Sequence, residues 1–173
     1  MPSSHNCAYA AVLLLIGCST SPASRDAIAG NNAATQIRTV RAHFNTAIAE
    51  HDTAAIWAIF LPEYHIVTGK NVQGHGGAEE LKHWNALFAD KTLVYVRRTR
   101  EVRVNEGWGI AEELGGWSGQ FTATDGPVST SGSYAAKWQR DTSGHWRLLA
   151  EVFTTLACNG GPIGCSPPQQ AAP

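Results

Sequence analysis

Residues 132–153, GSYAAKWQRDTSGHWRLLAEVF, contain two runs in which apolar and polar side chains alternate, with a polar turn between them. Alternation with a period of two is typical of β-strands that cover one side of a core. The segment Asp141-Thr142-Ser143-Gly144 has the composition of a hairpin turn. We therefore predict two antiparallel strands, over residues 129–140 and 145–157.

The same alternation extends upstream and predicts two more strands, over residues 92–104 and 108–122. Segments rich in Asn, Asp and Gly separate the strands, namely Asn105-Glu106-Gly107 and Thr124-Asp125-Gly126-Pro127. Such segments favour tight hairpin connections. The second half of the chain is therefore expected to form an antiparallel meander of four long strands.

The first half of the chain has a helical period instead. Ile37, Val40, Phe44 and Ile48 fall on one face of a helix that we expect to begin near Thr35. Helices followed by an antiparallel meander indicate the α+β class.

Further elements are predicted between this helix and the meander. Asp52 can cap a second helix that ends at Pro62, and a short strand over 64–68 follows. A glycine-rich turn region over 69–77 leads to a third helix over 78–89. We thus expect three N-terminal helices packed on a curved, mostly antiparallel sheet, with a pocket between the two layers.

The N-terminus has the pattern of an export signal. Residues 8–17 form an apolar run of the length of a signal-peptide core, too short to span a bilayer. Leu15-Ile16-Gly17-Cys18 resembles the lipobox of bacterial lipoproteins, in which the cysteine is lipidated. We predict a signal peptide over 1–17, lipidation of Cys18 and a flexible tether over 18–34; simple cleavage near Ala23 is the alternative. The expected location is the periplasm, with membrane contact only through the lipid.

Export would place the remaining cysteines in an oxidising compartment, where disulfides persist. Cys158 and Cys165 enclose the segment NGGPIG, whose glycines allow a tight loop. A redox or metal site is the rival interpretation, but the spacing is not that of such motifs. We predict a structural disulfide that pins the tail over 158–173.

Composition narrows the range of partners. The chain has a net charge of −1, with 43% hydrophobic and 16% charged residues, as in ordinary globular domains. The arginines at 97–103 form one basic cluster, but no aromatic residues interleave with them to stack bases, so we expect a solvated face and no nucleic-acid binding. The seven histidines are scattered, and we expect neither a metal site nor a cofactor.

Three segments carry a resemblance to a known family. They are HDTAAIWAIFLPEYHIV (51–67), GGAEELKHWNALF (76–88) and the hairpin at 132–153. With the order of predicted elements, they resemble the nuclear transport factor 2-like superfamily, and within it the SnoaL-like (polyketide cyclase-like) bacterial branch. The resemblance covers roughly residues 35–157, which we take as the domain.

The resemblance implies a cone-shaped α+β barrel with a deep apolar cavity and a homodimer formed through the outer face of the sheet. Members of the family include ketosteroid isomerase, scytalone dehydratase, polyketide cyclases and domains that only bind or dimerise. The isomerase positions are occupied here by Phe44, Thr68 and approximately Ala136, which supply no base and no oxyanion donors. We therefore exclude isomerase chemistry, and His65 has no identifiable partner for the dehydratase.

The remaining polar candidates for the cavity are His65, Glu113, Tyr134 and Glu151. The apolar wall is expected to include Trp84, Trp117 and Trp138. These seven residues are our candidate ligand-binding residues, and no catalytic set is identified.

Glu151 has two interpretations. Strict alternation puts it on one covered face of its strand with Leu149 and Phe153, and a buried carboxylate must be paired or protonated. It could be an acid/base or a ligand anchor, or it could pair with Lys137 or with an arginine of 97–103. We favour the ion pair.

The leading functional hypothesis is a domain that binds a small apolar or amphipathic molecule in its cone cavity. One alternative is a cofactor-free lyase, isomerase or cyclase that uses Glu151, Glu113 or His65 as acid/base and Tyr134 as donor. The other is a purely structural dimerisation module.

Overall fold

The computed structural model describes residues 22–168, and side chains from residue 29. The predicted signal peptide over 1–17 and Cys18 lie outside these residues. The elements, in chain order, are α1 (Pro22–Ala49), α2 (Thr53–Trp57), β1 (Phe60–Val67), β2 (Gln73–His75), α3 (Gly77–Leu87), β3 (Val94–Asn105), the 3-10 turn η1 (Glu106–Trp108), β4 (Ile110–Ala123), β5 (Gly126–Arg140) and β6 (Trp146–Asn159).

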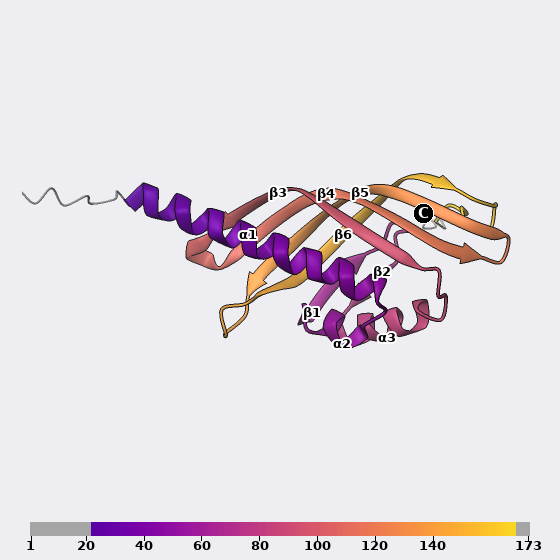
Figure 1. Cartoon of the computed structure of the whole chain (residues 1–173), viewed down its shortest axis with the longest axis horizontal. Helices are drawn as coiled ribbons and strands as arrows, with labels where there is room; N and C mark the ends of the chain where they lie inside the picture. The colour runs from indigo at the N-terminus through magenta and orange to yellow at the C-terminus, as the bar shows by residue number, and fades with distance from the viewer. Residues whose placement is uncertain (1–21, 169–173) are drawn as a thin grey trace, which may run out of the picture.

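The strands form one six-stranded sheet in the order β2-β1-β6-β5-β4-β3. Neighbouring strands are antiparallel except for β1 and β6, which pair in parallel. Figure 1 shows α1 lying along one face of the sheet, with α2 and α3 gathered at one end of it. The predicted α+β class, with helices on a curved and mostly antiparallel sheet, is confirmed.

The four long strands of the meander occur as predicted, with boundaries within three residues of the expected ones. The helix α1 is longer than expected, because it begins at Pro22 rather than near Thr35. Residues 22–34 are therefore helical and not a flexible tether. The alanine-rich composition of this stretch favours a helix, and Ala33 is buried in the core.

The region before α3 also differs from the prediction. The second helix ends at Trp57, and β1 already begins at Phe60, so Pro62 lies inside a strand. The pairing of β1 with β6 is interrupted between Phe60 and His65, so the missing N–H of Pro62 leaves no gap in a regular ladder. The predicted turn region contains β2, which pairs with the end of β1.

The last strand does not alternate strictly. Trp138 pairs with Leu148 and Lys137 pairs with Ala150, which leaves Leu149 as an extra residue, a β-bulge. The bulge moves the residues after it to the opposite face. Leu148 and Glu151 are consequently both buried, whereas strict alternation had placed them on different faces.

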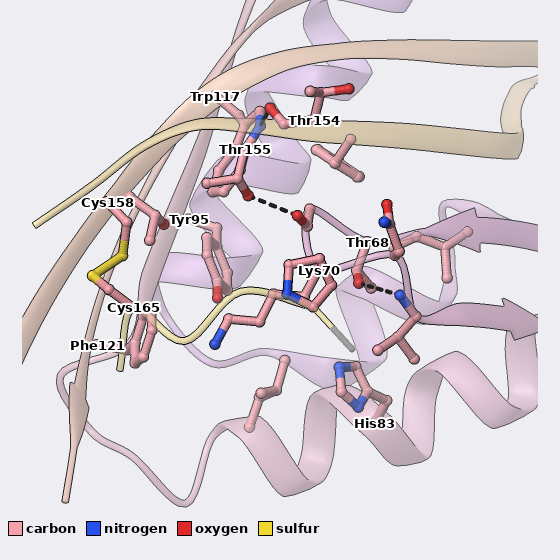
Figure 2. Close-up of a pocket in the computed structure, with 18 of the residues that line it drawn as sticks. Thr68, Lys70, His83, Tyr95, Trp117, Phe121, Thr154, Thr155, Cys158 and Cys165 are labelled. Atoms are coloured by element: carbon pink, nitrogen blue, oxygen red, sulfur yellow. Dashed lines mark hydrogen bonds between the residues drawn. A yellow bond between two sulfur atoms is a disulfide. The ribbon is translucent and has the colours of Figure 1, made fainter. Parts of the chain in front are cut away.

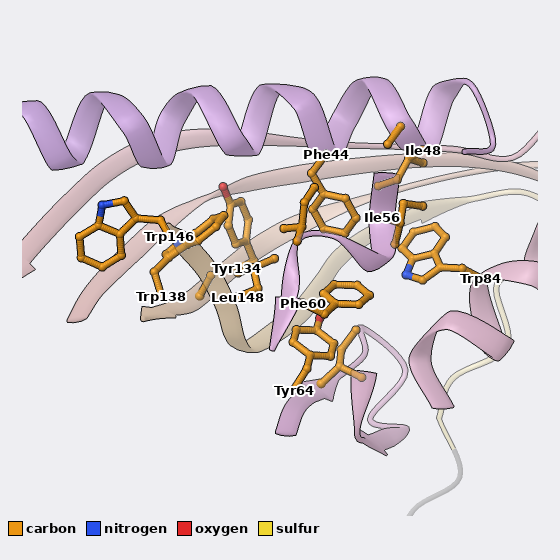
Figure 3. Close-up of a cluster of buried hydrophobic side chains, with 14 of the residues drawn as sticks. Phe44, Ile48, Ile56, Phe60, Tyr64, Trp84, Tyr134, Trp138, Trp146 and Leu148 are labelled. Carbon is orange, nitrogen blue, oxygen red and sulfur yellow. The ribbon is translucent and has the colours of Figure 1, made fainter. Parts of the chain in front are cut away.

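The hydrophobic core fills the space between α1 and the sheet. Figure 3 shows it running from Trp146 and Trp138 at one end, past Phe44, to Trp84 at the other. Some of its aromatic rings pack edge-on, as Phe44 does against Trp84 with ring centroids 6.1 Å apart, and others stack, as Phe60 does on Tyr64 at 4.3 Å. Within the described part of the chain, no helix is both long and apolar enough to span a membrane.

Candidate functional site

Buried charges lie under α1, in the middle of the core. Arg41 projects from α1 and binds two carboxylates, Glu113 of β4 and Glu151 of β6. Its Nη2 and Nε atoms donate to Glu113 at 2.8 and 3.1 Å. Its Nη1 lies 2.8 Å from Oε1 of Glu151 in an ionic contact that is not aligned as a hydrogen bond. Arg41 thus joins the helix to two strands of the sheet.

Neutral donors complete the coordination of both carboxylates. The hydroxyls of Thr99 and Tyr134 each donate to Oε1 of Glu113 at 2.6 Å, and Nε1 of Trp138 donates to Oε2 at 2.8 Å. The hydroxyl of Tyr64 donates to Oε2 of Glu151 at 2.8 Å. We call these residues the buried network: Arg41, Tyr64, Thr99, Glu113, Tyr134, Trp138 and Glu151.

The pKa shifts in the buried network keep its charges fixed. Burial alone raises the pKa of Glu113, but the charge and hydrogen bonds of Arg41, with those from Thr99 and Tyr134, outweigh burial and lower it. Burial and the neighbouring carboxylates raise the pKa of both Tyr64 and Tyr134, so both phenols stay protonated. Because these shifts keep Glu113 ionised and both phenols protonated, the network is suited to holding the fold rather than to moving protons.

A separate pocket of about 600 Å³ opens beside this network. Figure 2 shows Lys70, His83, Tyr95 and Trp117 around it and the Cys158–Cys165 disulfide at its rim. Its wall is mostly aromatic and aliphatic, formed by Trp84, Tyr95, Trp117, Phe121 and Phe153 among others. Its size and its largely apolar lining are those of a small-molecule site.

Glycines in the strands make room for this aromatic wall. A Cβ at Gly119 of β4 would collide with the ring of Tyr95. One at Gly132 of β5 would collide with the backbone carbonyl of Thr154 on β6 and would also lie 2.8 Å from Nε1 of Trp117. Glycine weakens a strand, so its presence inside two adjacent strands indicates a demand for close approach. At Gly119 the demand is the seating of a ring that lines the pocket, and at Gly132 it is first the approach of the neighbouring main chain.

Two buried charged side chains of the pocket wall lie on β3 and α3. Arg97 is 5% exposed and Glu80 is 6% exposed, and both line the pocket together with Trp84. We call these three residues the polar wall. The main chain of β2 covers Glu80, since a Cβ on Gly74 would lie 3.5 Å from Oε2 of Glu80.

The polar wall lacks partners that the buried network has. Within residues 22–168, Nε and Nη1 of Arg97 and Nε1 of Trp84 are buried without a hydrogen-bond partner. Burial and the charge of Glu151 raise the pKa of Glu80 to about 7, although the charge of Arg97 opposes this shift. Glu80 can therefore gain or lose a proton near neutral pH.

The C-terminal segment closes one side of the pocket mouth. The predicted disulfide between Cys158 and Cys165 is present. Nζ of Lys70 donates to the carbonyl of Gly164 at 3.1 Å, and Asp125 accepts hydrogen bonds from the backbone of Ile163 and Gly164. The disulfide loop is thus tied to the β1–β2 turn over the opening.

The structure divides the seven candidate residues predicted from sequence into three groups. Trp84 and Trp117 line the pocket. Glu113, Tyr134, Trp138 and Glu151 belong to the buried network instead. His65 is exposed, and its Nδ1 lies 2.6 Å from Nδ1 of His75 on the neighbouring strand, so the expectation that it faces the cavity is wrong.

The ion-pair interpretation of Glu151 agrees with the structure, but the main partner is Arg41 of α1, which the sequence analysis did not consider. Arg97 contributes a longer contact, 3.7 Å from Nε to Oε1 of Glu151, and Lys137 is exposed. The prediction of a solvated arginine face fails for Arg97 alone, because its side chain turns into the core.

Arg41, Glu80 and Arg97 were missed, although two of them carry a signal. Arg41 falls on the apolar stripe of α1, and Glu80 lies four residues before Trp84 on the buried side of α3. A charge on an apolar helix face needs a buried partner or a function. Within the part of the chain that the structure describes, no group of three or more metal-ligating side chains is found.

Of the positions used by the isomerase, Phe44 and Ala136 belong to the hydrophobic core. Thr68 lines the pocket, and its hydroxyl accepts a hydrogen bond from the backbone of Val72 at 3.1 Å. These residues supply no ionisable group.

Comparison with known proteins gives structural matches only. No sequence profile of a known family matches the chain, and no curated protein matches it. A ketosteroid isomerase-like protein from Erwinia carotovora atroseptica superposes with a TM-score of 0.62 at 16% identity, covering 73% of this chain and 98% of that one.

Two further solved structures agree with this match. A type 2 hexachlorocyclohexane dehydrochlorinase gives a TM-score of 0.63 at 13% identity, covering 84% of this chain and 98% of that one. An NTF-2 like protein of unknown function from Shewanella oneidensis gives a TM-score of 0.57 at 13% identity, covering 69% of this chain and 97% of that one. Identities this low establish the fold and nothing about activity. The chain therefore has the cone-shaped nuclear transport factor 2-like fold.

Proposed function

We propose that this protein binds a small amphipathic molecule in the open pocket between α3, the β1–β2 turn and the sheet. The observation that carries the proposal is the pocket itself, a space of about 600 Å³ with an aromatic wall and a few polar groups. The glycine at 119 makes room for the Tyr95 ring of that wall at a cost to its strand. A fold with no ligand to accommodate would gain stability by filling this space.

We further propose that the protein is exported and anchored through Cys18. The Cys158–Cys165 disulfide supports an oxidising compartment. An anchor at Cys18 would lie four residues before the start of α1.

Dimerisation through the outer sheet face is also a proposal. Val152 and Leu156 of β6 are 49% and 72% exposed, and both are apolar. Exposed apolar residues on the uncovered side of a sheet are typical of a protein–protein contact.

An acid/base enzyme is the second candidate function, and Glu80 is the residue that favours it. A carboxyl group that titrates near neutral pH beside an apolar cavity has the properties of a general acid or base. Glu113 and Glu151 are unsuited to this role because they are held in ion pairs away from the pocket, and His65 lies outside it.

Ligand capture tests the proposed function. The full chain is purified from an oxidising compartment, incubated with lipid and metabolite extracts, and its native mass is compared with its denatured mass. We expect one small molecule retained per subunit and a dimer. Leu87→Trp, which projects into the pocket, should abolish retention, whereas Ala86→Trp on the exposed side of the same helix should not. A pocket that stays empty contradicts the proposal. If the wild type releases the captured molecule in chemically altered form and the Glu80→Gln variant releases it unchanged, the enzyme is favoured.

A further inference from the structure

We infer that the pocket selects small apolar molecules that carry a carboxylate, and that this carboxylate docks on Arg97. The inference rests on the proposed binding function and specifies its ligand class. It starts from the difference between two buried arginines that share one glutamate.

Arg97 is the less satisfied of these two arginines. Arg41 donates three hydrogen bonds to Glu113, and its Nη1 lies 2.8 Å from Oε1 of Glu151. Among residues 22–168, the only ionic contact of Arg97 is Glu151 at 3.7 Å, and its Nε and Nη1 have no acceptor. A guanidinium buried to this degree without acceptors is unfavourable unless another group supplies them.

Arg97 is nevertheless held firmly in place. Asn45 of α1 binds its backbone on both sides, accepting from the N–H at 2.9 Å and donating to the carbonyl at 2.8 Å. The rings of Phe44 and Phe153 lie 4.7 and 5.1 Å from the guanidinium carbon. Aromatic faces position a cation without using its N–H groups, so Nε and Nη1 of Arg97 keep their hydrogen-bonding capacity unused.

A further unpaired donor lies beside Arg97. Nε1 of Trp84, whose ring centroid is 5.7 Å from the guanidinium carbon, has no partner within the described residues. The acceptor nearest to Nε of Arg97, Oε1 of Glu151, is 3.7 Å away. A carboxylate offers about four acceptor sites in a plane, which matches the fork of a guanidinium and one further N–H. A cationic ligand would leave all of these donors unpaired.

Glu80 makes the charge of this site depend on pH. The groups that face it are Arg97 of β3, Glu151 of β6 and Tyr64 of β1, while His83 of α3 lies farther along the same pocket. The two arginines balance Glu113 and Glu151. A bound carboxylate therefore meets a neutral site when Glu80 is protonated and a negative one when Glu80 is ionised.

Affinity for a carboxylate should consequently fall as the pH rises. With the pKa of Glu80 at about 7, the loss is at most about tenfold for each pH unit above 7, because each ligand bound would require one proton on Glu80. Glu80→Gln should remove this dependence. His83→Gln, which keeps Glu80, should leave it unchanged.

An isosteric pair of probes tests the inference. The full chain is titrated with 2-naphthylacetate and with 2-naphthylacetamide, which differ in charge and hardly in shape, by calorimetry between pH 6 and 8.5. We expect the acid to bind more tightly than the amide by about 10- to 100-fold at pH 6, the range expected of hydrogen bonds to charged groups. Arg97→Met should abolish this preference while the amide still binds, and Arg97→Lys should retain part of it.

Each outcome bears on a different claim. Equal binding of the two probes, or a preference that survives Arg97→Met, overturns the inference and leaves the binding function intact. Absence of binding by both naphthyl probes, and by decanoate and decanamide, overturns the inference and counts against the proposed function as well. If Arg97→Met does not fold, Arg97→Lys decides the question through the same ratio of affinities.

Discussion

Two groups of buried charges lie side by side under α1, and they differ in how completely they are satisfied. In the buried network, each carboxylate oxygen of Glu113 accepts from at least two donors, and Arg41 binds two glutamates. In the polar wall, Arg97 and Trp84 have N–H groups with no partner among the described residues, and Glu80 titrates near neutral pH. The charged side chains of both groups are buried, so burial alone does not distinguish them.

The difference indicates a division of roles. A network in which most polar atoms are hydrogen-bonded or in close ionic contact stabilises a unique packing, and it loses much when one member is removed. An unsaturated group lowers stability, and it persists where a ligand completes it or where a proton must move. The buried network therefore belongs to the fold, and the polar wall belongs to the pocket.

Removal of Arg41 should have the largest effect. Arg41→Met leaves Glu113 and Glu151 buried without their shared cation, and we expect a loss of about 3–5 kcal/mol in the free energy of unfolding. Chemical denaturation measures this loss. Arg38→Met, at an exposed position of the same helix, is the matched control and should change stability by less than about 0.5 kcal/mol. Similar effects of the two variants would contradict the structural role of the buried network.

The double variant Arg41→Met with Glu113→Gln sharpens this test. It removes a cation and an anion together, so we expect it to be more stable than the sum of the two single losses predicts. Strict additivity would mean that the two residues are not energetically coupled.

The disulfide at the rim should have the next largest effect. Cys158→Ser with Cys165→Ser opens a loop in which the cysteines are seven positions apart, and chain entropy predicts a loss of about 2 kcal/mol. Since the disulfide loop covers the pocket mouth, ligand affinity should fall in parallel, while the buried network stays intact. Thermal unfolding and calorimetry measure the two effects, and a loss of stability with unchanged affinity would show that the loop takes no part in binding.

Glu80→Gln should have an effect of opposite sign that depends on pH. The pKa of Glu80 is raised from its ordinary value of 4.5 to about 7 in the folded protein. Between these values the folded state holds a proton that the unfolded state has released, so stability falls as the pH rises from about 4.5 to 7. Glu80→Gln removes that penalty, and we expect a gain of about 1–2 kcal/mol at pH 8 and none near pH 4.

Urea denaturation at the two pH values checks this sign. Glu79→Gln, at the adjacent exposed position, is the control and should show no such pH dependence. A loss of stability at pH 8 would mean that ionised Glu80 is a partner in the buried network rather than an unsatisfied group of the pocket.

Most of the fold could be predicted from sequence because the patterns that indicate its helices and strands lie within short segments of the chain. The four long strands alternate and are separated by turn residues, and the stripe of Ile37, Phe44 and Ile48 marks α1. The exceptions are also physical. The bulge at Leu149 reverses a face without any change of composition, and β2 forms only because β1 supplies its partner.

The candidate site was predictable only in part, because it depends on which charges meet. Trp84 and Trp117 could be assigned to a cavity wall from their apolar character. Arg41 and Glu113 lie 72 positions apart in sequence, and nothing in either segment specifies the other. Arg97 is buried and its neighbour Arg98 is exposed because they lie on opposite faces of β3. The interrupted register of β3 between Thr99 and Glu101 makes it difficult to assign these faces from the sequence.

Arg97→Met should have the smallest effect on stability, although it alters a buried charge as Arg41→Met does. Glu151 keeps Arg41 at 2.8 Å and the hydroxyl of Tyr64 at 2.8 Å, so it is not left unpaired. The variant loses the contacts of the guanidinium with Phe44 and Phe153 but also removes unsatisfied N–H groups from the interior, and replacement of poorly paired charges by apolar side chains is often neutral.

We therefore expect Arg97→Met to change the free energy of unfolding by less than about 1 kcal/mol near pH 5, where Glu80 is protonated. Between pH 5 and pH 8 the variant should lose more stability than the wild type does. The charge of Arg97 lowers the pKa of Glu80, so its removal raises that pKa further and increases the loss at high pH. A cost equal to that of Arg41→Met at both pH values would place Arg97 in the buried network. The polar wall would then be a continuation of the fold, and its unsatisfied groups would no longer point to a ligand.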